Sequence, residues 1–180
     1  GDHVQSICAV TVIDRANEAE IMNFSPDENT KYYENWKFKN KSKYILAIHP
    51  KTYLPNQFEA RLDKMIALIE KTMELEMHPK NPSVVNRANK PVIWVGGTRD
   101  TYSQNDGIIG IHSADMDLWN ESALLVGRYV ANCILYRNST HCGEILGSYY
   151  GSSVAYDALE NSELISAEYR IDKDSFVSWD

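Results

Sequence analysis

Positive charge is scarce in this chain of 180 residues, where 18 Lys and Arg stand against 25 Asp and Glu and give a formal net charge of −7 at pH 7. Because phosphate groups are bound by basic faces, this balance argues against a nucleic-acid partner. The longest basic run, "KFKNKSK" at 37–43, is short and is expected to be a solvated loop. Long apolar runs are also missing: the longest candidate, 123–135, is broken by Gly127, Arg128 and Asn132. A bilayer requires roughly 20 apolar residues, so no membrane span is expected.

The usual catalytic and cofactor motifs are absent as well. The chain has no G-x-x-x-x-G-K-[ST] or G-x-G-x-x-G loop, no Cys-x-x-Cys pair and no G-x-S-x-G elbow. We therefore expect no cofactor and no metal. Three cysteines do not form a disulfide framework. Cys133 and Cys142 are near enough in sequence to bridge, which would leave Cys8 over; the alternative is three reduced, mostly buried thiols.

The termini and the glycosylation motifs bear on the compartment. The start, "GDHVQS", lacks an initiator Met and a signal peptide, so a leader has been removed or the chain has been trimmed. Asn-x-Ser/Thr acceptors occur at Asn23, Asn40, Asn120 and Asn138, and Pro26 weakens the first. This modest excess favours a secreted or exported protein. The end, "DKDSFVSWD", has no obvious stop signal, and a fragment of a larger chain is a further structural possibility.

Apolar patterning predicts a mixed set of strands in the first two thirds of the chain. A composition of 43% hydrophobic and 24% charged residues suits one domain with a real core. A long polar connection at 15–42 carries a short edge strand near 32–38, and a polar hairpin loop is expected at 98–106. The main strands are expected at 6–14, 43–50, 90–97 and, at an edge of the sheet, 107–113.

Two main helices are predicted. The first, 53–77, has one apolar stripe (Phe58, Leu62, Met65, Ile66, Ile69 and Met73) and a charged outer surface. Asn56 is its expected cap, with Glu59 placed as in a capping box. The second, 117–136, is apolar nearly all round, and Asp115 or Asp117 is expected to cap it.

A smaller part is expected to follow the second helix. It consists of a Gly/Ser-rich loop at 137–153, a short helix at 154–161 and a strand at 164–171. Together the elements predict a single α+β domain over 1–180, with helices packed on one mixed sheet.

Candidate chemistry gathers in two short stretches. In "HSADMD", His112, Asp115 and Asp117 suggest a metal or acid/base site, although capping of the following helix is the favoured explanation of the two carboxylates. In "THCGE", His141, Cys142 and Glu144 suggest a thiol nucleophile, but adjacent residues rarely face each other in the way such a site needs.

Tyr149, in "GSYYGSSVAY", offers a flat apolar face with a polar tip to a sugar or peptide groove, or packs under a loop.

The order of elements resembles the upper subdomain of zincin metallopeptidases: a strand, a long amphipathic helix, two strands with the second at an edge, then a buried helix. In that family the second helix carries H-E-x-x-H, in which two histidines hold zinc and the Glu activates a water. "SALLVGRYVANC" is similar to the context of that motif, but Val126, Gly127 and Val130 stand at its three positions. Valine cannot bind a metal and glycine cannot serve as a base. The resemblance covers roughly 43–136, and 137–180 would form the smaller C-terminal part.

Gly127 and Arg128, in the middle of a buried helix, allow two interpretations. In a zincin-like scaffold they form the floor of a vacated cleft, where Arg128 offers a planar fork to a carboxylate of Glu121 or of a ligand. Alternatively, Gly127 permits the close approach of another element, while Arg128 snorkels to the surface.

Two functional hypotheses follow. The first is a non-catalytic, exported recognition domain that binds a protein or glycan, possessing a degenerate peptidase scaffold and a cleft near His112, Asp115, Arg128, His141, Glu144 and Tyr149. The second is a hydrolase, metal-dependent or cysteine-based, whose scattered residues converge in space: His49, His112, Asp115, His141, Cys142 and Glu144.

Overall fold

The computed structural model describes residues 37–77, 91–96, 102–104, 108–111, 122–138 and 147–178. The strand predicted at 6–14 lies outside these residues. The described elements follow in the order β1 (Lys37–Asn40), β2 (Ile45–Ile48), α3 (Phe58–Met73), β3 (Val92–Val95), β4 (Tyr102–Gln104), β5 (Ile108–Ile111), α4 (Ala123–Asn138), α5 (Gly147–Leu159), the 3-10 helix η4 (Ala167–Tyr169) and α6 (Lys173–Val177). The α+β class and the mixed sheet predicted from the sequence are confirmed.

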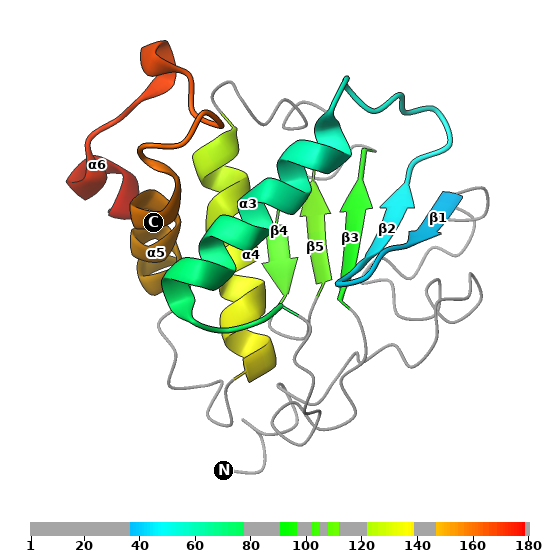
Figure 1. Cartoon of the computed structure of the whole chain (residues 1–180), viewed down its shortest axis with the longest axis horizontal. Helices are drawn as coiled ribbons and strands as arrows, with labels where there is room; N and C mark the ends of the chain where they lie inside the picture. Colours follow the sequence, from blue (N-terminus) through cyan, green and yellow to red (C-terminus); the bar gives the residue numbers. More distant parts are fainter. Residues whose placement is uncertain are drawn as a thin grey trace.

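The five described strands form one sheet in the order β1-β2-β3-β5-β4 (Figure 1). The three inner strands β2, β3 and β5 are parallel, while β1 and β4 pair antiparallel with β2 and β5 at the two edges. All four residues of β2 are buried. This explains why β2 is a continuous apolar run, since an inner parallel strand is covered on both faces.

The edge on the side of β5 differs from the prediction. The strand predicted at 107–113 is present as β5, but it lies inside the sheet as a parallel neighbour of β3. The edge is formed by β4, which lies within the predicted hairpin loop at 98–106, and the hairpin is the one between β4 and β5. The sequence of β4, Tyr-Ser-Gln, has no apolar alternation that would distinguish it from a loop.

Helix α3 confirms the apolar stripe but not the cap. Phe58, Leu62, Met65, Ile66 and Ile69 are buried, and Met73 is half-buried.

The helix begins after Gln57, which has a left-handed backbone (φ 64°) and makes no side-chain cap, so the cap predicted at Asn56 is wrong. Glu59 does not complete a capping box with that residue. Its carboxylate accepts hydrogen bonds from Lys39 and Lys41 of the β1–β2 hairpin.

Helix α4 begins at Ala123, later than predicted, so neither Asp115 nor Asp117 caps it. Both aspartates lie outside the described residues. The first turn is closed by the N–H of Val126, which donates to the carbonyl of Ser122 at 2.9 Å.

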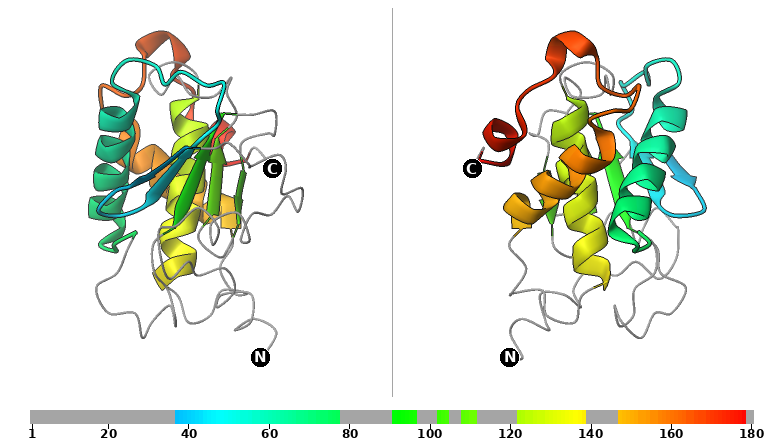
Figure 2. Two further views of the ribbon diagram at one scale, coloured as in Figure 1. Left: turned by 90° about the vertical axis from the view of Figure 1, so that its right-hand side faces the viewer. Right: turned by 60° about the vertical axis from the view of Figure 1, so that its left-hand side comes forward.

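The C-terminal part differs most from the prediction. Helix α5 starts at Gly147, so the second half of the predicted loop at 137–153 is helical. The strand predicted at 164–171 is absent; the chain there forms turns and η4, and Ala167 and Tyr169 are exposed rather than facing a core. The alternation of apolar residues was therefore misleading, because this segment wraps around the end of α5 and leads into α6 (Figure 2).

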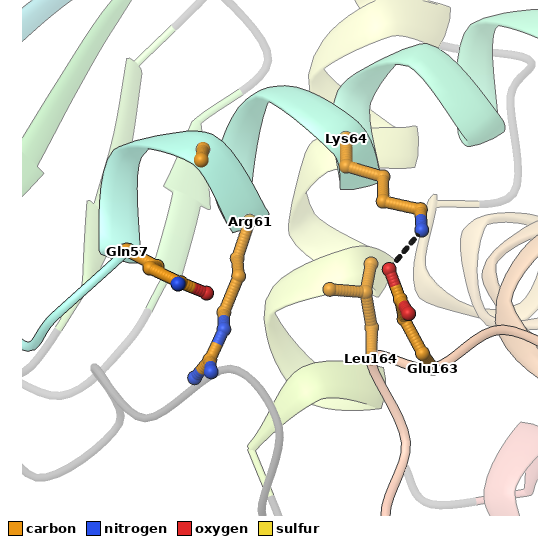
Figure 3. A pocket seen from close by; sticks show the side chains of 6 residues that line it. Gln57, Arg61, Lys64, Glu163 and Leu164 are labelled. Carbon is orange, nitrogen blue, oxygen red and sulfur yellow. Dashed lines mark hydrogen bonds and ion pairs between the residues drawn. The ribbon is translucent and has the colours of Figure 1, made fainter.

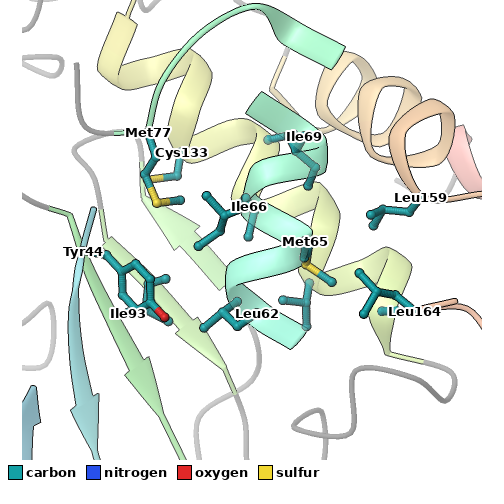
Figure 4. Close-up of a cluster of buried hydrophobic side chains, with 14 of the residues drawn as sticks. Tyr44, Leu62, Met65, Ile66, Ile69, Met77, Ile93, Cys133, Leu159 and Leu164 are labelled. Carbon is teal, nitrogen blue, oxygen red and sulfur yellow. The ribbon is translucent and has the colours of Figure 1, made fainter. Parts of the chain in front are cut away.

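The core lies between the sheet and the helices. Helices α3 and α4 lie between the sheet on one side and α5 on the other (Figures 1 and 4). Each layer contributes to a single buried cluster, for which Leu46, Ile66, Val130, Leu159 and Phe176 are representative. Fully burying such a side chain stabilises the fold by about 1.5–3 kcal/mol. No described helix has the length and apolarity needed to cross a membrane.

Candidate binding site

Most of the residues predicted to line a cleft fall outside the described part of the chain. This applies to His112, Asp115, His141 and Glu144, as well as to Cys142. Tyr149 belongs to α5, but its side chain is not described. That these residues come together in one cleft therefore stays a prediction. Arg128 is the predicted cleft residue whose side chain the structure describes.

Arg128 is buried inside the molecule. Its side chain is only 7% exposed, so the prediction that it snorkels to the surface is wrong. The guanidinium carbon lies 5.2 Å from the centre of the Tyr129 ring and 5.9 Å from that of Phe176 in α6. A weakly hydrated guanidinium over aromatic faces is a favourable arrangement in a desolvated site. Arg128 thus contacts the C-terminal helix, and its role in a cleft stays a prediction.

Gly127 provides the close approach that one of the two interpretations expects. A Cβ atom built on Gly127 would lie 2.7 Å from Cδ1 of Leu159 and 3.4 Å from Cβ of Ala155, both on α5. Gly151 does the same from the opposite side: its Cβ would lie 2.0 Å from Oδ1 of Asn132 on α4. Two glycines, one on each helix, therefore allow α4 and α5 to pack in direct contact.

The positions of α4 that resemble the zincin motif are part of this packed interior. Val126 and Val130 are both fully buried members of the core cluster, and Gly127 between them is covered by α5. In the described residues, no group of three His, Cys, Asp or Glu side chains is placed to hold a metal ion. The sequence shows that the residues at these positions can neither bind a metal nor act as a base. The structure adds that apolar side chains fill the space around them.

Cys133 is fully buried in the core on α4, as the alternative of buried thiols expects. Cys142 lies outside the described residues, so the bridge between the two cysteines stays a prediction.

His49 is the one histidine whose surroundings are described. It follows β2, and its backbone N–H donates to the carbonyl of Val95. Its ring Nδ1 accepts a hydrogen bond from the backbone N–H of Lys51 at 3.1 Å. Burial, followed by the nearby charge of Lys51, lowers the pKa of the imidazole below its usual value. The ring is therefore mainly neutral at pH 7.

A pocket of about 340 Å³ opens between α3 and the segment that follows α5 (Figure 3). Its walls carry Arg61 and Lys64 from α3 and Glu163 from the later segment, and Gln57, Ala60 and Leu164 complete the lining. Lys64 forms an ion pair with Glu163 across the opening, and Gln57 and Arg61 lie together at the other end. With two cations and one carboxylate, the lining is positive on balance in a protein of net negative charge.

The ion pair with Lys64 favours the ionised form of Glu163. The hydrogen bond from Lys64 and the charges of Lys64 and Arg61 lower the pKa of Glu163, so its carboxylate stays ionised at neutral pH. Both side chains of the pair are well exposed, and such surface pairs stabilise a protein by only about 0–1 kcal/mol. Either partner can therefore exchange the other for a ligand at low cost. Arg61 and Lys64 are three residues apart on one helix, which was the available sequence signal, but Glu163 is 99 residues further along than Lys64.

A second cluster of charges fixes the β1–β2 hairpin to α3. Lys39 and Lys41 donate to Glu59 at 2.7 and 3.2 Å, and Lys41 also donates to Asp63 at 2.9 Å. The buried hydroxyl of Tyr44 donates to the other oxygen of Asp63 at 2.6 Å, and burial together with this bond raises the pKa of Tyr44. The basic run predicted to be a solvated loop is therefore part of the hairpin, and its Lys39, Lys41 and Lys43 have carboxylate partners.

Comparison of the chain with models of protein families, with curated proteins and with solved structures found no match.

Proposed function

We propose that this protein is a non-catalytic recognition domain that acts outside the cell and binds a protein or glycan partner. Its scaffold, in this proposal, is a degenerate version of the zincin peptidase arrangement. The proposal combines the packed interior of α4, the order of the elements and the charged pocket beside α3.

The interior of α4 is the observation that carries the proposal. A zinc peptidase needs two imidazoles and a carboxylate that face an open, water-containing position. At the corresponding places Val126 and Val130 are fully buried, and a methyl group on Gly127 would already overlap Leu159. A metal and its water would have no space on this face of the helix.

The order of elements supports the degenerate scaffold. Strand β2, amphipathic helix α3, strand β3 and, after the β4–β5 hairpin, buried helix α4 follow one another as in the resemblance that motivated the proposal. The hairpin departs from that resemblance, because the strand expected at the edge is the inner strand β5 and an additional strand, β4, forms the edge.

The pocket beside α3 supplies a place for a partner to bind. Lys64 presents a flexible ammonium, a group that donates well to a carboxylate, and Arg61 adds positive charge to the same lining. Acidic side chains of proteins and sialic acids of glycans carry a carboxylate. A partner carboxylate would take the place of Glu163 at Lys64, which costs little because that pair is exposed.

Metal analysis of the purified protein tests the non-catalytic part of the proposal. We expect zinc far below one equivalent, no change in thermal stability on addition of EDTA and no peptide hydrolysis. Stoichiometric zinc whose removal lowers stability would contradict the proposal.

Binding to a glutamate-rich peptide and to a sialylated glycan tests the pocket. Lys64→Ala is expected to weaken the binding of the preferred probe several-fold. Lys71→Ala is the matched control, because Lys71 is an exposed lysine of the same helix that does not line the pocket. Equal effects of the two substitutions would show that only net charge matters.

A further inference from the structure

The pocket between α3 and the segment after α5 has the size of a site for one compact group (Figure 3). Its volume of about 340 Å³ lies at the lower end of the range of small-molecule sites, about 300–1,000 Å³. One wall is α3, with Gln57 directly before its first residue, and the other is the turn that carries Glu163 and Leu164. Neither wall is a strand edge, so a partner peptide cannot add to the sheet here as an extra strand. The pocket therefore suits one side group of a partner better than a length of its backbone.

The lining offers hydrogen-bond acceptors as well as positive charge. When a partner carboxylate binds Lys64, the carboxylate of Glu163 loses the ammonium with which it pairs. An ionised carboxylate only accepts hydrogen bonds, so it then needs donors from the partner. At the other end of the pocket Gln57 adds an amide, which both donates and accepts and is not used to cap α3. The lining therefore matches a partner group that combines one carboxylate with several hydroxyl groups.

This combination distinguishes an acidic sugar from an acidic peptide. The side chain of a glutamate or an aspartate has a carboxylate and no hydroxyl, so it leaves Glu163 without a donor. The other carboxylates of an acidic peptide would approach Glu163 on a protein whose formal net charge is −7, and like charges repel. A sugar with a single carboxylate brings one negative charge and carries hydroxyl donors on the same molecule.

We propose that this pocket binds the terminal acidic sugar of a glycan, with the sugar carboxylate on Lys64 and sugar hydroxyls donating to Glu163 and to the amide of Gln57. The inference rests on the proposed function, because it names the partner class of the same site. Arg61 contributes positive charge to the lining. Sialic acids and uronic acids share the required chemistry, and the two sources are separated by experiment.

An NMR titration of the unaltered protein at about 0.15 M salt, where long-range attraction between charges is screened, tests the proposal. The probes are sialyllactose, a disaccharide that ends in glucuronic acid, neutral lactose and an oligoglutamate peptide. We expect at least one of the two acidic sugars to bind at least several-fold more tightly than lactose and than the peptide, and the tighter of the two identifies the source. Equal or tighter binding of the peptide, or no preference for an acidic sugar over lactose, would overturn the proposal.

Two substitutions test the assigned contacts. Gln57 has a left-handed backbone (φ 64°), which glycine adopts freely, so Gln57→Gly removes the amide without backbone strain. It is expected to weaken the acidic sugar several-fold and to leave the urea midpoint nearly unchanged. Glu163→Gln releases Lys64 and removes an acceptor, so it should strengthen the peptide by a larger factor than the sugar. An equal gain for both probes would show that Glu163 does not accept the sugar hydroxyls.

Lys71→Ala is the control, because this exposed lysine of α3 does not line the pocket, and all four affinities should stay unchanged. A failure of this proposal is distinguishable from a failure of the proposed function. A preference for the peptide would reject the acidic sugar and leave recognition of a protein partner in place. Metal content, which tests the non-catalytic part, is independent of both probes.

Discussion

Replacing Gly127 with alanine is expected to destabilise the wild-type protein and to stabilise a variant in which Leu159 has been shortened. Alanine is favoured over glycine in a helix by about 0.5–1 kcal/mol. The new methyl group would lie 2.7 Å from Cδ1 of Leu159, which is fully buried and has little room to move. Overpacking of this kind costs about 1–3 kcal/mol. The net result is a loss of about 1–2 kcal/mol for Gly127→Ala.

Leu159→Ala removes the atom responsible for the overlap. That substitution alone should cost about 2–5 kcal/mol, because it leaves a cavity between α4 and α5. Adding Gly127→Ala to it should then recover about 0.5–1 kcal/mol from helix propensity and more from filling part of the cavity. The effect of one substitution thus changes sign between two backgrounds.

Urea unfolding followed by far-UV circular dichroism measures each free energy of unfolding. The control is Gly151→Ala, whose Cβ would lie 3.1 Å from the backbone oxygen of Arg128 and 2.0 Å from Oδ1 of Asn132. Leu159 is not among these neighbours, so Gly151→Ala should destabilise both backgrounds. If Gly127→Ala stabilised the wild type by its full helix propensity, the packing argument would be refuted.

Two further predictions concern the attachment of the hairpin to α3. Asp63→Ala should lower the free energy of unfolding by about 1–3 kcal/mol, because it leaves the buried hydroxyl of Tyr44 without its acceptor. In a Tyr44→Phe background the loss measured by urea unfolding should be smaller. An equal loss in both backgrounds would disprove the coupling between Tyr44 and Asp63. The hydrogen bond from Lys39 is the largest cause of the lowered pKa of Glu59. This carboxylate therefore stabilises the fold above its unfolded pKa of about 4.3, and the stabilisation is lost as the pH falls through its lower folded pKa. The urea midpoint of the wild type should therefore fall between about pH 5 and about pH 3 more steeply than that of Glu59→Gln, and equal slopes would exclude this carboxylate as a source of the acid sensitivity.

The elements that were predicted correctly are those with strong apolar patterns. The stripe of α3 repeats at helical spacing from Phe58 to Ile69, and β2 is a continuous apolar run. Such patterns reflect burial directly. The start of α5 was missed for the opposite reason. Gly147 and Gly151 are poor helix formers by themselves, and packing against α4 favours the helix there.

The candidate site was harder to predict because it depends on contacts between distant residues. The pocket joins Lys64 to Glu163, and no spacing rule relates positions in two separate segments. One of the two interpretations of Arg128 placed it at the surface, where arginine usually lies. Its burial depends on the ring of Phe176, in a helix that the sequence pattern did not predict at all.

The lysines of β1 have a further consequence for the behaviour of the protein in solution. β1 is an outer strand of the described sheet, and an outer strand is a ready template for the same strand of another molecule. In an antiparallel match of two such strands, Lys37 and Lys39 of one copy would face those of the other, and like charges placed opposite each other repel. Lys37, together with Lys39, which fastens the hairpin to its own helix, therefore discourages fibril-like growth from this side of the molecule.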